Sequence, residues 1–220
     1  SPYLFDELFK LGIKVSMINI IPDDINIIAS NIKFMIDNVD LLISCGGVGP
    51  THDDVTIEGI AKAFNRKVVQ HEELIQVVRD YHKEIHDGNI KMTFIPEGAE
   101  LIYSKDIRYP TVYIEKVIIL PGIPEIMKLK FDSFKEFLRN KPFFVNRIYL
   151  NVHEYRITSI LNNVVQEFPE ISFGSYPKTG ICEYKVMLSI ESKDKELLER
   201  ASDRLIELIP KEMVIKLEQD

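Results

Sequence analysis

The sequence has few cysteines, no long apolar run and no excess of basic residues. Its two cysteines, Cys45 and Cys182, have neither the spacing of a metal site nor that of a disulfide framework, so we expect a reducing, cytoplasmic compartment. No run of about 18 apolar residues occurs, which predicts that the chain has no membrane-spanning helix. With 34 acidic against 27 basic residues the net charge is −7, and this disfavours nucleic acid as a partner.

Hydrophobic residues make up 45% of the 220 residues, enough for a core in one or two domains. Over residues 1–142, helical stripes alternate with apolar strands, the pattern of a parallel sheet covered by helices on both faces. The fold class expected for this domain is therefore α/β, a three-layer α/β/α arrangement with a mostly parallel sheet. The expected helices are 2–11, 25–38, 55–64, 71–86 and 124–139, and the expected strands include 13–20, 40–45 and 117–120.

After residues 140–142 the pattern changes, which places a domain boundary near residue 142. Residues 143–220 are expected to form a small α+β domain, in which the two strands on either side of residues 176–180 make a hairpin. Its expected strands are 144–151, 171–176, 181–191 and 212–217, and its expected helices are 154–168 and 193–209.

The most informative segment is residues 45–56, which follows an apolar strand and opens a helix. Three glycines, Gly46, Gly47 and Gly49, let backbone amides approach a ligand, and the helix N-terminus adds partial positive charge. Asp53 and Asp54 then close the loop, where a loop that binds only anions would carry lysine. This pattern predicts a phosphate-containing ligand held through a divalent metal.

Ligands of parallel sheets bind beyond the carboxyl ends of the strands. The turns at 21–24, 46–54 and 121–124 each follow an expected strand, so we expect them to converge on one site. An acidic pocket without a metal would repel a substrate that carries two negative charges. The charge pattern therefore predicts metal dependence.

Each candidate side chain also has a plainer interpretation. Aspartates that precede a helix are often only N-caps, which applies to the pairs Asp23 with Asp24 and Asp53 with Asp54. His52 could act as an acid, a metal ligand or a phosphate donor, or could be an exposed loop residue.

Two further sets of polar residues are weaker candidates. His82 and His86 have the i, i+4 spacing of a metal site, but a solvated helix face is the favoured interpretation. Lys178, Tyr184 and Lys185 could reach an anionic ligand, although such residues are common on surface strands.

Four segments together resemble the molybdopterin-binding domain of the MogA/MoaB/CinA superfamily. They are I-P-D-D at 21–24, G-G-V-G-P-T-H-D-D-V-T at 46–56, P-E-G-A at 96–99 and L-P-G-I-P at 120–124. The T-H-D-D motif is similar to the one in the CinA branch and in the related domain of eukaryotic FAD synthases. G-S-Y-P at 174–177 and E-Y-K-V at 183–186 resemble the second subdomain of the FAD synthase version.

The resemblance also implies parts that these 220 residues lack. Family members begin with a strand that ends in a G-[DN]-E turn, which forms one wall of the ligand pocket, and that first strand is expected before residue 1. The adenylyl-transferring domain of FAD synthase is likewise outside this sequence.

For activity, the resemblance implies that the pocket binds molybdopterin or a dinucleotide and cleaves pyrophosphates such as FAD and ADP-ribose. The implied cofactors are a divalent metal (cobalt, magnesium or manganese) and potassium, and the implied assembly is a homo-oligomer. Asp23, Asp53 and Asp54 would hold the metal, with Asp54, Asp53 and His52 as catalytic residues. The residues implied to contact the ligand are Gly46, Gly47, Val48, Gly49, Thr51, Thr56, Gly122 and Pro124.

Two other functions stay open at this point. The domain could be a non-catalytic module that senses flavin or pterin nucleotides and regulates an attached FAD synthase. It could also take part in adenylylation of molybdopterin during molybdenum-cofactor synthesis, although the T-H-D-D motif and the second domain argue against this. Nothing in the sequence separates the enzyme from the regulatory module, because one pocket would serve both.

Overall fold

The computed structural model describes residues 1–81, 84–104, 107–180 and 182–219, which form two compact units. One unit is Val15–Leu138, and the other joins Ser1–Lys14 to Arg139–Asp220. The second unit includes the first helix, α1 (Pro2–Lys10), which the sequence placed in the N-terminal domain. The reason is contact with residues just past the boundary: the rings of Phe9 and Phe143 stack with centroids 5.1 Å apart, and the Asn140 amide donates to the Leu11 carbonyl at 2.8 Å.

The Val15–Leu138 unit is built on a four-stranded sheet with the order β1-β6-β5-β4. Its strands are β1 (Leu42–Cys45), β4 (Glu100–Ser104), β5 (Ile107–Ile114) and β6 (Val117–Leu120). β1 pairs with β6 in parallel, whereas β4 with β5 and β5 with β6 pair antiparallel. The predicted α/β class is confirmed, but the sheet is mixed, because the short links from β4 to β6 allow only antiparallel pairing.

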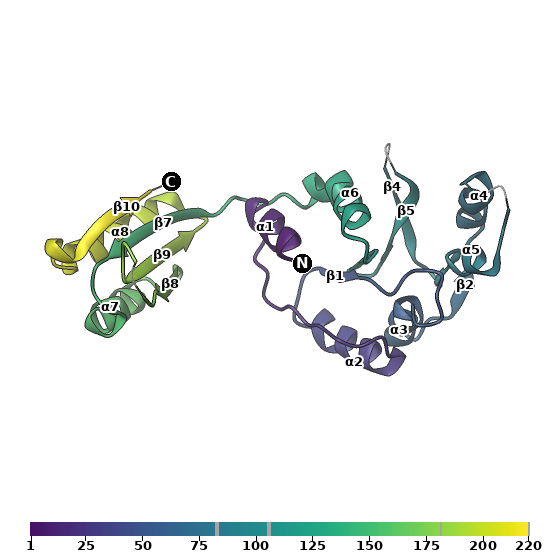
Figure 1. The fold of residues 1–220 in the computed structure, drawn as a ribbon, viewed down its shortest axis with the longest axis horizontal. Helices are drawn as coiled ribbons and strands as arrows, with labels where there is room; N and C mark the ends of the chain where they lie inside the picture. The colour runs from purple at the N-terminus through teal and green to yellow at the C-terminus, as the bar shows by residue number, and fades with distance from the viewer. Residues whose placement is uncertain (82–83, 105–106, 181, 220) are drawn as a thin grey trace. The chain divides into compact units, whose positions relative to one another are not determined.

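Helices cover both faces of this sheet, as the three-layer prediction requires (Figure 1). On one side lie α2 (Ile25–Ile36) and α3 (Thr56–Ala63), and on the other lies α6 (Pro124–Phe134), which a 3-10 turn extends over Lys135–Leu138. The core between α2, α3 and the sheet contains Ile28, Ile60 and Ile119. All four residues of β6 are buried, which explains why its sequence is continuously apolar.

A small antiparallel ribbon and two helices complete this unit. The ribbon pairs β2 (Val68–Gln70) with β3 (Phe94–Pro96), and the helices are α4 (Glu72–Tyr81) and α5 (Asp87–Lys91). The single helix expected at 71–86 is wrong at its end, because His86 is the N-cap of α5 and donates its amide to the Asn89 side chain at 3.0 Å. His82 lies outside the described residues.

The strand predicted at 13–20 does not form. These residues have no regular secondary structure, and Ile18 and Ile20 are 63% and 97% exposed. A strand needs hydrogen bonds from a neighbour, and no strand of the described residues pairs with this segment.

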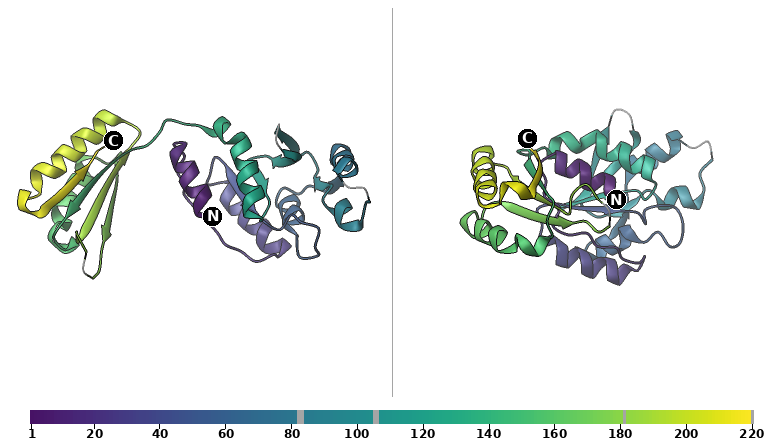
Figure 2. Two further views of the ribbon diagram at one scale, coloured as in Figure 1. Left: turned by 45° about the horizontal axis from the view of Figure 1, so that its top comes forward. Right: turned by 60° about the vertical axis from the view of Figure 1, so that its left-hand side comes forward.

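The C-terminal residues form the predicted α+β unit, with an antiparallel sheet in the order β10-β7-β9-β8 (Figure 2). Its strands are β7 (Phe144–Leu150), β8 (Ser172–Pro177), β9 (Val186–Ser192) and β10 (Val214–Glu218). Its helices α7 (Thr158–Glu167) and α8 (Lys195–Leu208) pack on the sheet through a core that includes Val164, Leu188 and Leu205. Short 3-10 turns span Glu154–Arg156 and Lys211–Met213.

The predicted β8–β9 hairpin is confirmed, although β9 begins at Val186, not at residue 181. Beyond the strand ends, the amide of Lys178 donates to the carbonyl of Lys185 at 2.8 Å, and the amide of Lys185 donates to the carbonyl of Leu150 at 2.8 Å.

Two expectations from composition agree with the structure. Cys45 and Cys182 are both free thiols. Among the described residues, no helix combines the length and the apolar character needed to cross a bilayer.

The close crossing of α2 and α3 makes a prediction about Gly59. A Cβ at Gly59 would lie 2.4 Å from Cγ2 of Ile28. We expect Gly59→Ala to lower the free energy of unfolding by about 1–3 kcal/mol because the site is overpacked, as measured by urea denaturation. An Ile28→Ala change should cost less in the Gly59→Ala background than alone. A stabilising Gly59→Ala, as for an exposed helical glycine, would contradict this packing.

Candidate functional site

The three predicted turns meet at one end of the sheet. Because β1 and β6 are parallel with Cys45 opposite Leu120, the loops that follow them leave the sheet side by side. A Cβ on Gly122 would be 3.2 Å from the Cα of Gly46, so the two backbones touch. From the third turn, Oδ1 of Asp23 lies 3.1 Å from the position of a Cβ on Gly47. The turns converge although the strand expected before Asp23 is absent.

The glycine loop is shaped by contacts that a side chain would prevent. Gly47 has a φ of +64°, and a Cβ there would overlap Oγ1 of Thr56 at 2.3 Å. The amide of Thr56 donates to the Gly47 carbonyl at 2.9 Å, which ties the loop to the first turn of α3. Gly49 is equally restricted, since a Cβ would lie 2.7 Å from the carboxylate of Asp54.

Asp54 closes this loop and is not a helix cap. Its Oδ2 accepts the Thr51 amide at 2.9 Å and the Thr51 hydroxyl at 2.5 Å, whereas the N-cap of α3 is Val55. Burial by itself raises the pKa of the Asp54 carboxyl, but hydrogen bonds from Thr51 and the Gly49 amide, with the charge of Lys91, lower it overall. Asp54 is therefore an anion held toward the loop. Asp24, in contrast, is a plain N-cap, whose side chain accepts the first amides of α2.

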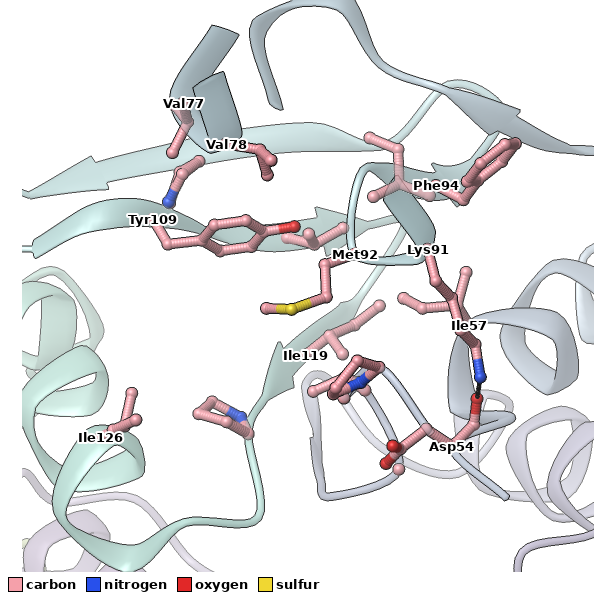
Figure 3. Close-up of a pocket in the computed structure, with 18 of the residues that line it drawn as sticks. Asp54, Ile57, Val77, Val78, Lys91, Met92, Phe94, Tyr109, Ile119 and Ile126 are labelled. Atoms are coloured by element: carbon pink, nitrogen blue, oxygen red, sulfur yellow. Dashed lines mark hydrogen bonds between the residues drawn. The ribbon is translucent and has the colours of Figure 1, made fainter. Parts of the chain in front are cut away.

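Lys91 fixes the loop from the opposite side, and sequence reasoning missed it. From the end of α5, its Nζ donates to the carbonyls of Thr51 and Asp54, the latter at 2.8 Å (Figure 3). The same helix packs against the loop where Gly88 faces Pro50. The lysine that the loop lacks in sequence is thus supplied from 37 residues further along the chain.

Next to the loop, the unit contains a chamber of about 1300 Å³. Five of the residues implied by the resemblance line it: Gly47, Val48, Gly49, Asp54 and Gly122. Its other walls are mostly apolar and come from α3, α4, α5 and α6 with the sheet (Figure 3), and they include Ile57, Val78, Met92, Phe94, Tyr109, Ile119 and Ile126.

The other predicted site residues do not line this chamber. The side chains of His52 and Asp53 are 99% and 66% exposed and lie 3.9 Å apart on the outer turn of the loop. Thr51 and Thr56 hold the loop from within, and Pro124 begins α6. Lys178, Tyr184 and Lys185 belong to the other unit, where Lys178 Nζ lies 4.4 Å from the centre of the Tyr184 ring.

The predicted metal set is not gathered into a preformed cage. Within the part of the chain that the structure describes, no three acidic, histidine or cysteine side chains are grouped to hold an ion. Asp23 and Asp54 nevertheless both contact the glycine loop. Magnesium-type cations commonly take only one or two carboxylates and complete their shell with phosphate oxygens and water. The residues therefore fit a metal that binds together with a phosphate ligand.

The chamber is not acidic, contrary to the expectation from sequence. Three carboxylates line it, from Asp54, Glu58 and Asp87, and they are matched by three basic side chains, from Lys91, Arg108 and Lys130. Charge repulsion alone therefore does not require a metal in this chamber.

Two of these charged residues have unused hydrogen-bonding capacity. Oε2 of Glu58 is buried and has no partner among the described residues. Lys130 is 6% exposed, and its Nζ donates to the Pro110 carbonyl at 2.7 Å and lies 5.2 Å from the centre of the Tyr109 ring. Burial lowers the pKa of Lys130 to about 8 and raises that of Tyr109.

A signal for Lys130 does exist in the sequence. It lies on the face of α6 that carries Met127, Phe131 and Phe134, all buried, where an apolar residue is expected.

The buried ammonium group predicts how stability depends on pH. The folded pKa of Lys130, about 8, is below the unfolded value of roughly 10.4, so between these values the unfolded chain binds more protons and stability rises with pH. We expect the unfolding free energy of the wild type, relative to Lys130→Met, to rise by about 2–3 kcal/mol from pH 7 to pH 10. Urea denaturation measures it, with Lys128→Met on the exposed face of α6 as the control. A difference independent of pH would contradict the burial of this charge.

Two protein families match this chain. The family described as "Probable molybdopterin binding domain" matches residues 1–140. The family described as "FAD synthase, middle domain" matches residues 142–218. The two ranges meet where the composition of the sequence changes.

Individual relatives agree with these matches. A protein of Archaeoglobus fulgidus is 35% identical over 95% of this chain and 89% of its own length. The "Probable FAD synthase" of Caenorhabditis elegans is 26% identical over 95% of this chain, which spans only 46% of that relative. Among solved structures, the protein CinA of Thermoplasma acidophilum, of unknown function, superposes with a TM-score of 0.57 at 26% identity, over 62% of this chain and 85% of that one.

Proposed function

Because this chain belongs to the molybdopterin-binding domain family and continues into an FAD synthase-type middle domain, we propose that it hydrolyses dinucleotide pyrophosphates with a divalent metal. The proposed substrate is FAD, split into FMN and AMP, or a similar dinucleotide such as ADP-ribose.

One observation carries this proposal: a glycine loop, restrained by Asp54 and Lys91, borders a chamber of about 1300 Å³. Drug-sized ligands occupy pockets of roughly 300–1,000 Å³, so the chamber has room for a nucleotide-sized group. Backbone amides and the α3 N-terminus favour phosphate at the loop, and apolar walls favour a ring in the chamber. A dinucleotide pyrophosphate has both parts.

Different residues of the chain would bind the phosphate, hold the metal and accept the proton of the attacking water. The loop at Gly47–Gly49 would bind one phosphate, and Asp23 with Asp54 would hold the metal, which when bound supplies Lewis-acid activation of a water. The water oxygen attacks one phosphorus atom, the bridging P–O bond breaks, and FMN and AMP leave. Glu58 is the group we assign to take the proton of that water, because its free Oε2 is on a residue that lines the same chamber.

The runner-up is a non-catalytic module that binds flavin or pterin nucleotides and regulates FAD synthesis. The observation in its favour is that no preformed group of three metal ligands exists among the described residues. It needs the same loop and chamber but neither metal nor base, so turnover separates the two.

The direct test is to incubate the protein with FAD and cobalt, magnesium or manganese, and to quantify FMN and AMP by chromatography. We expect turnover that depends on the metal, and Asp54→Asn should lower it at least ~100-fold, the scale of removing one positioned catalytic group. Asp203→Asn, on the exposed face of α8 in the other unit, is the matched control. Binding of FAD without cleavage of FAD or ADP-ribose at any of these metals would replace the enzyme with the regulatory module.

A second variant tests the proposed base. Glu58→Gln keeps the size of the side chain but cannot take a proton, so we expect kcat to fall about 100-fold with little change in KM. Glu97→Gln, an exposed glutamate of the same unit, should behave as wild type. Equal activity of Glu58→Gln and wild type across the pH range would remove Glu58 from the mechanism.

A further inference from the structure

The part of the chamber beside α6 contains a cation that the hydrolytic mechanism does not use. Lys130 is 6% exposed and lines the chamber, yet among the described residues its Nζ has one hydrogen-bond acceptor, the Pro110 carbonyl at 2.7 Å. No carboxylate of these residues forms an ion pair with it. An ammonium group has three N–H donors, so two are available to a ligand.

The chamber that Lys130 lines is suited to a flat ring. Figure 3 shows Tyr109, Met92 and Ile119 around one space, with Ile126 of α6 and Asp54 of the glycine loop on opposite sides of it. An aromatic ring, a thioether and branched aliphatic chains favour contact with a planar aromatic group. The chamber that Lys130 lines therefore has groups that favour a ring, with the Tyr109 ring centre 5.2 Å from the amine, while phosphate is expected at the loop.

We infer that this end of the chamber is a subsite for the oxo-bearing ring of a flavin, in which Lys130 donates a hydrogen bond to a carbonyl oxygen of the dioxopyrimidine edge. The inference rests on the proposed function, since it decides which half of FAD enters the chamber. The flavin enters, and the adenylyl half extends outward past the glycine loop.

The chemistry of Lys130 explains why a flavin fits better than adenine. A lysine ammonium can only donate hydrogen bonds, and the isoalloxazine ring presents two carbonyl oxygens on one edge. Adenine has no carbonyl group, and although its ring nitrogens N1 and N7 accept hydrogen bonds, each lies next to the exocyclic amine, which is itself a donor. Burial of an uncompensated cation is costly, so a ligand that supplies acceptors gains more here than at the surface.

The test measures binding in EDTA, so that no metal-dependent hydrolysis occurs. Riboflavin and FMN are titrated by their fluorescence, and AMP and ADP-ribose by calorimetry, against wild type, Lys130→Met and the control Lys128→Met. We expect Lys130→Met to weaken riboflavin and FMN binding about 10-fold or more, the effect of a lost charge-assisted hydrogen bond. AMP and ADP-ribose binding should not change, and Lys128→Met should match wild type for every ligand. Equal flavin affinity of Lys130→Met and wild type, or no flavin binding by wild type, would overturn the inference.

A measurement on the wild-type protein covers the case in which Lys130→Met does not fold. At pH 8 the buried amine is partly neutral, so acetic anhydride can label it and mass spectrometry of the peptide reports the yield. Saturating FMN should protect Lys130, and AMP should not; labelling that FMN leaves unchanged would overturn the inference.

The two proposals fail in different ways. Flavin binding that depends on Lys130, without FAD cleavage, removes the hydrolase and keeps the subsite. FAD cleavage without flavin binding that depends on Lys130 does the opposite.

Discussion

The parallel pairing of β1 with β6 is the constraint on which the site depends. It sets Cys45 opposite Leu120, so that two loops distant in sequence leave the same end of the sheet with Gly46 against Gly122. A Cβ on Gly122 would lie only 3.2 Å from Gly46, and Gly46 has a φ of +98°, so both positions favour glycine. Asp23 reaches the same place from a third segment, and the α3 N-terminus follows directly from the loop. The strand pair therefore positions the two loops and the N-terminus of α3, to which Asp23 is added from outside the sheet.

The charged residues of this site form two groups: some hold the glycine loop, and others have hydrogen-bonding capacity that is left for a ligand. Asp54 accepts hydrogen bonds from Thr51, and Lys91 donates to the loop carbonyls, so both residues hold the loop in shape, in addition to the metal-binding role proposed for Asp54. Glu58 and Lys130 differ, because each is buried with hydrogen-bonding capacity that the described residues leave unused. A buried polar group without partners costs free energy. A ligand in the chamber would lower this cost by supplying the missing hydrogen-bond partners.

Much of the fold could be read from residue patterns. A helix cap was one of the two roles that the sequence left open for Asp23 and Asp24, and Asp24 has it. The continuous apolar run at 117–120 is a buried strand, and the change of pattern after residue 142 marks the α+β unit. The strand at 13–20 failed for a physical reason: alternating apolar residues favour an extended chain, but a strand also needs a hydrogen-bonding neighbour, which local sequence does not specify. The grouping of α1 with the C-terminal unit likewise depends on the contact of Phe9 with Phe143, which is 134 residues away.

By itself, the sequence determined the location of the loop, because glycine spacing after an apolar strand and the aspartates that follow it are local features that backbone geometry demands. It also determined the family, through the motif at residues 46–56. Only the tertiary structure decided which side chains line the chamber. It turned Asp53 and His52 outward, brought Lys91 to the loop, and placed Glu58 and Lys130 in the chamber walls. These positions follow from the packing of α3, α5 and α6 around the sheet, and contacts between distant segments leave little trace in local composition.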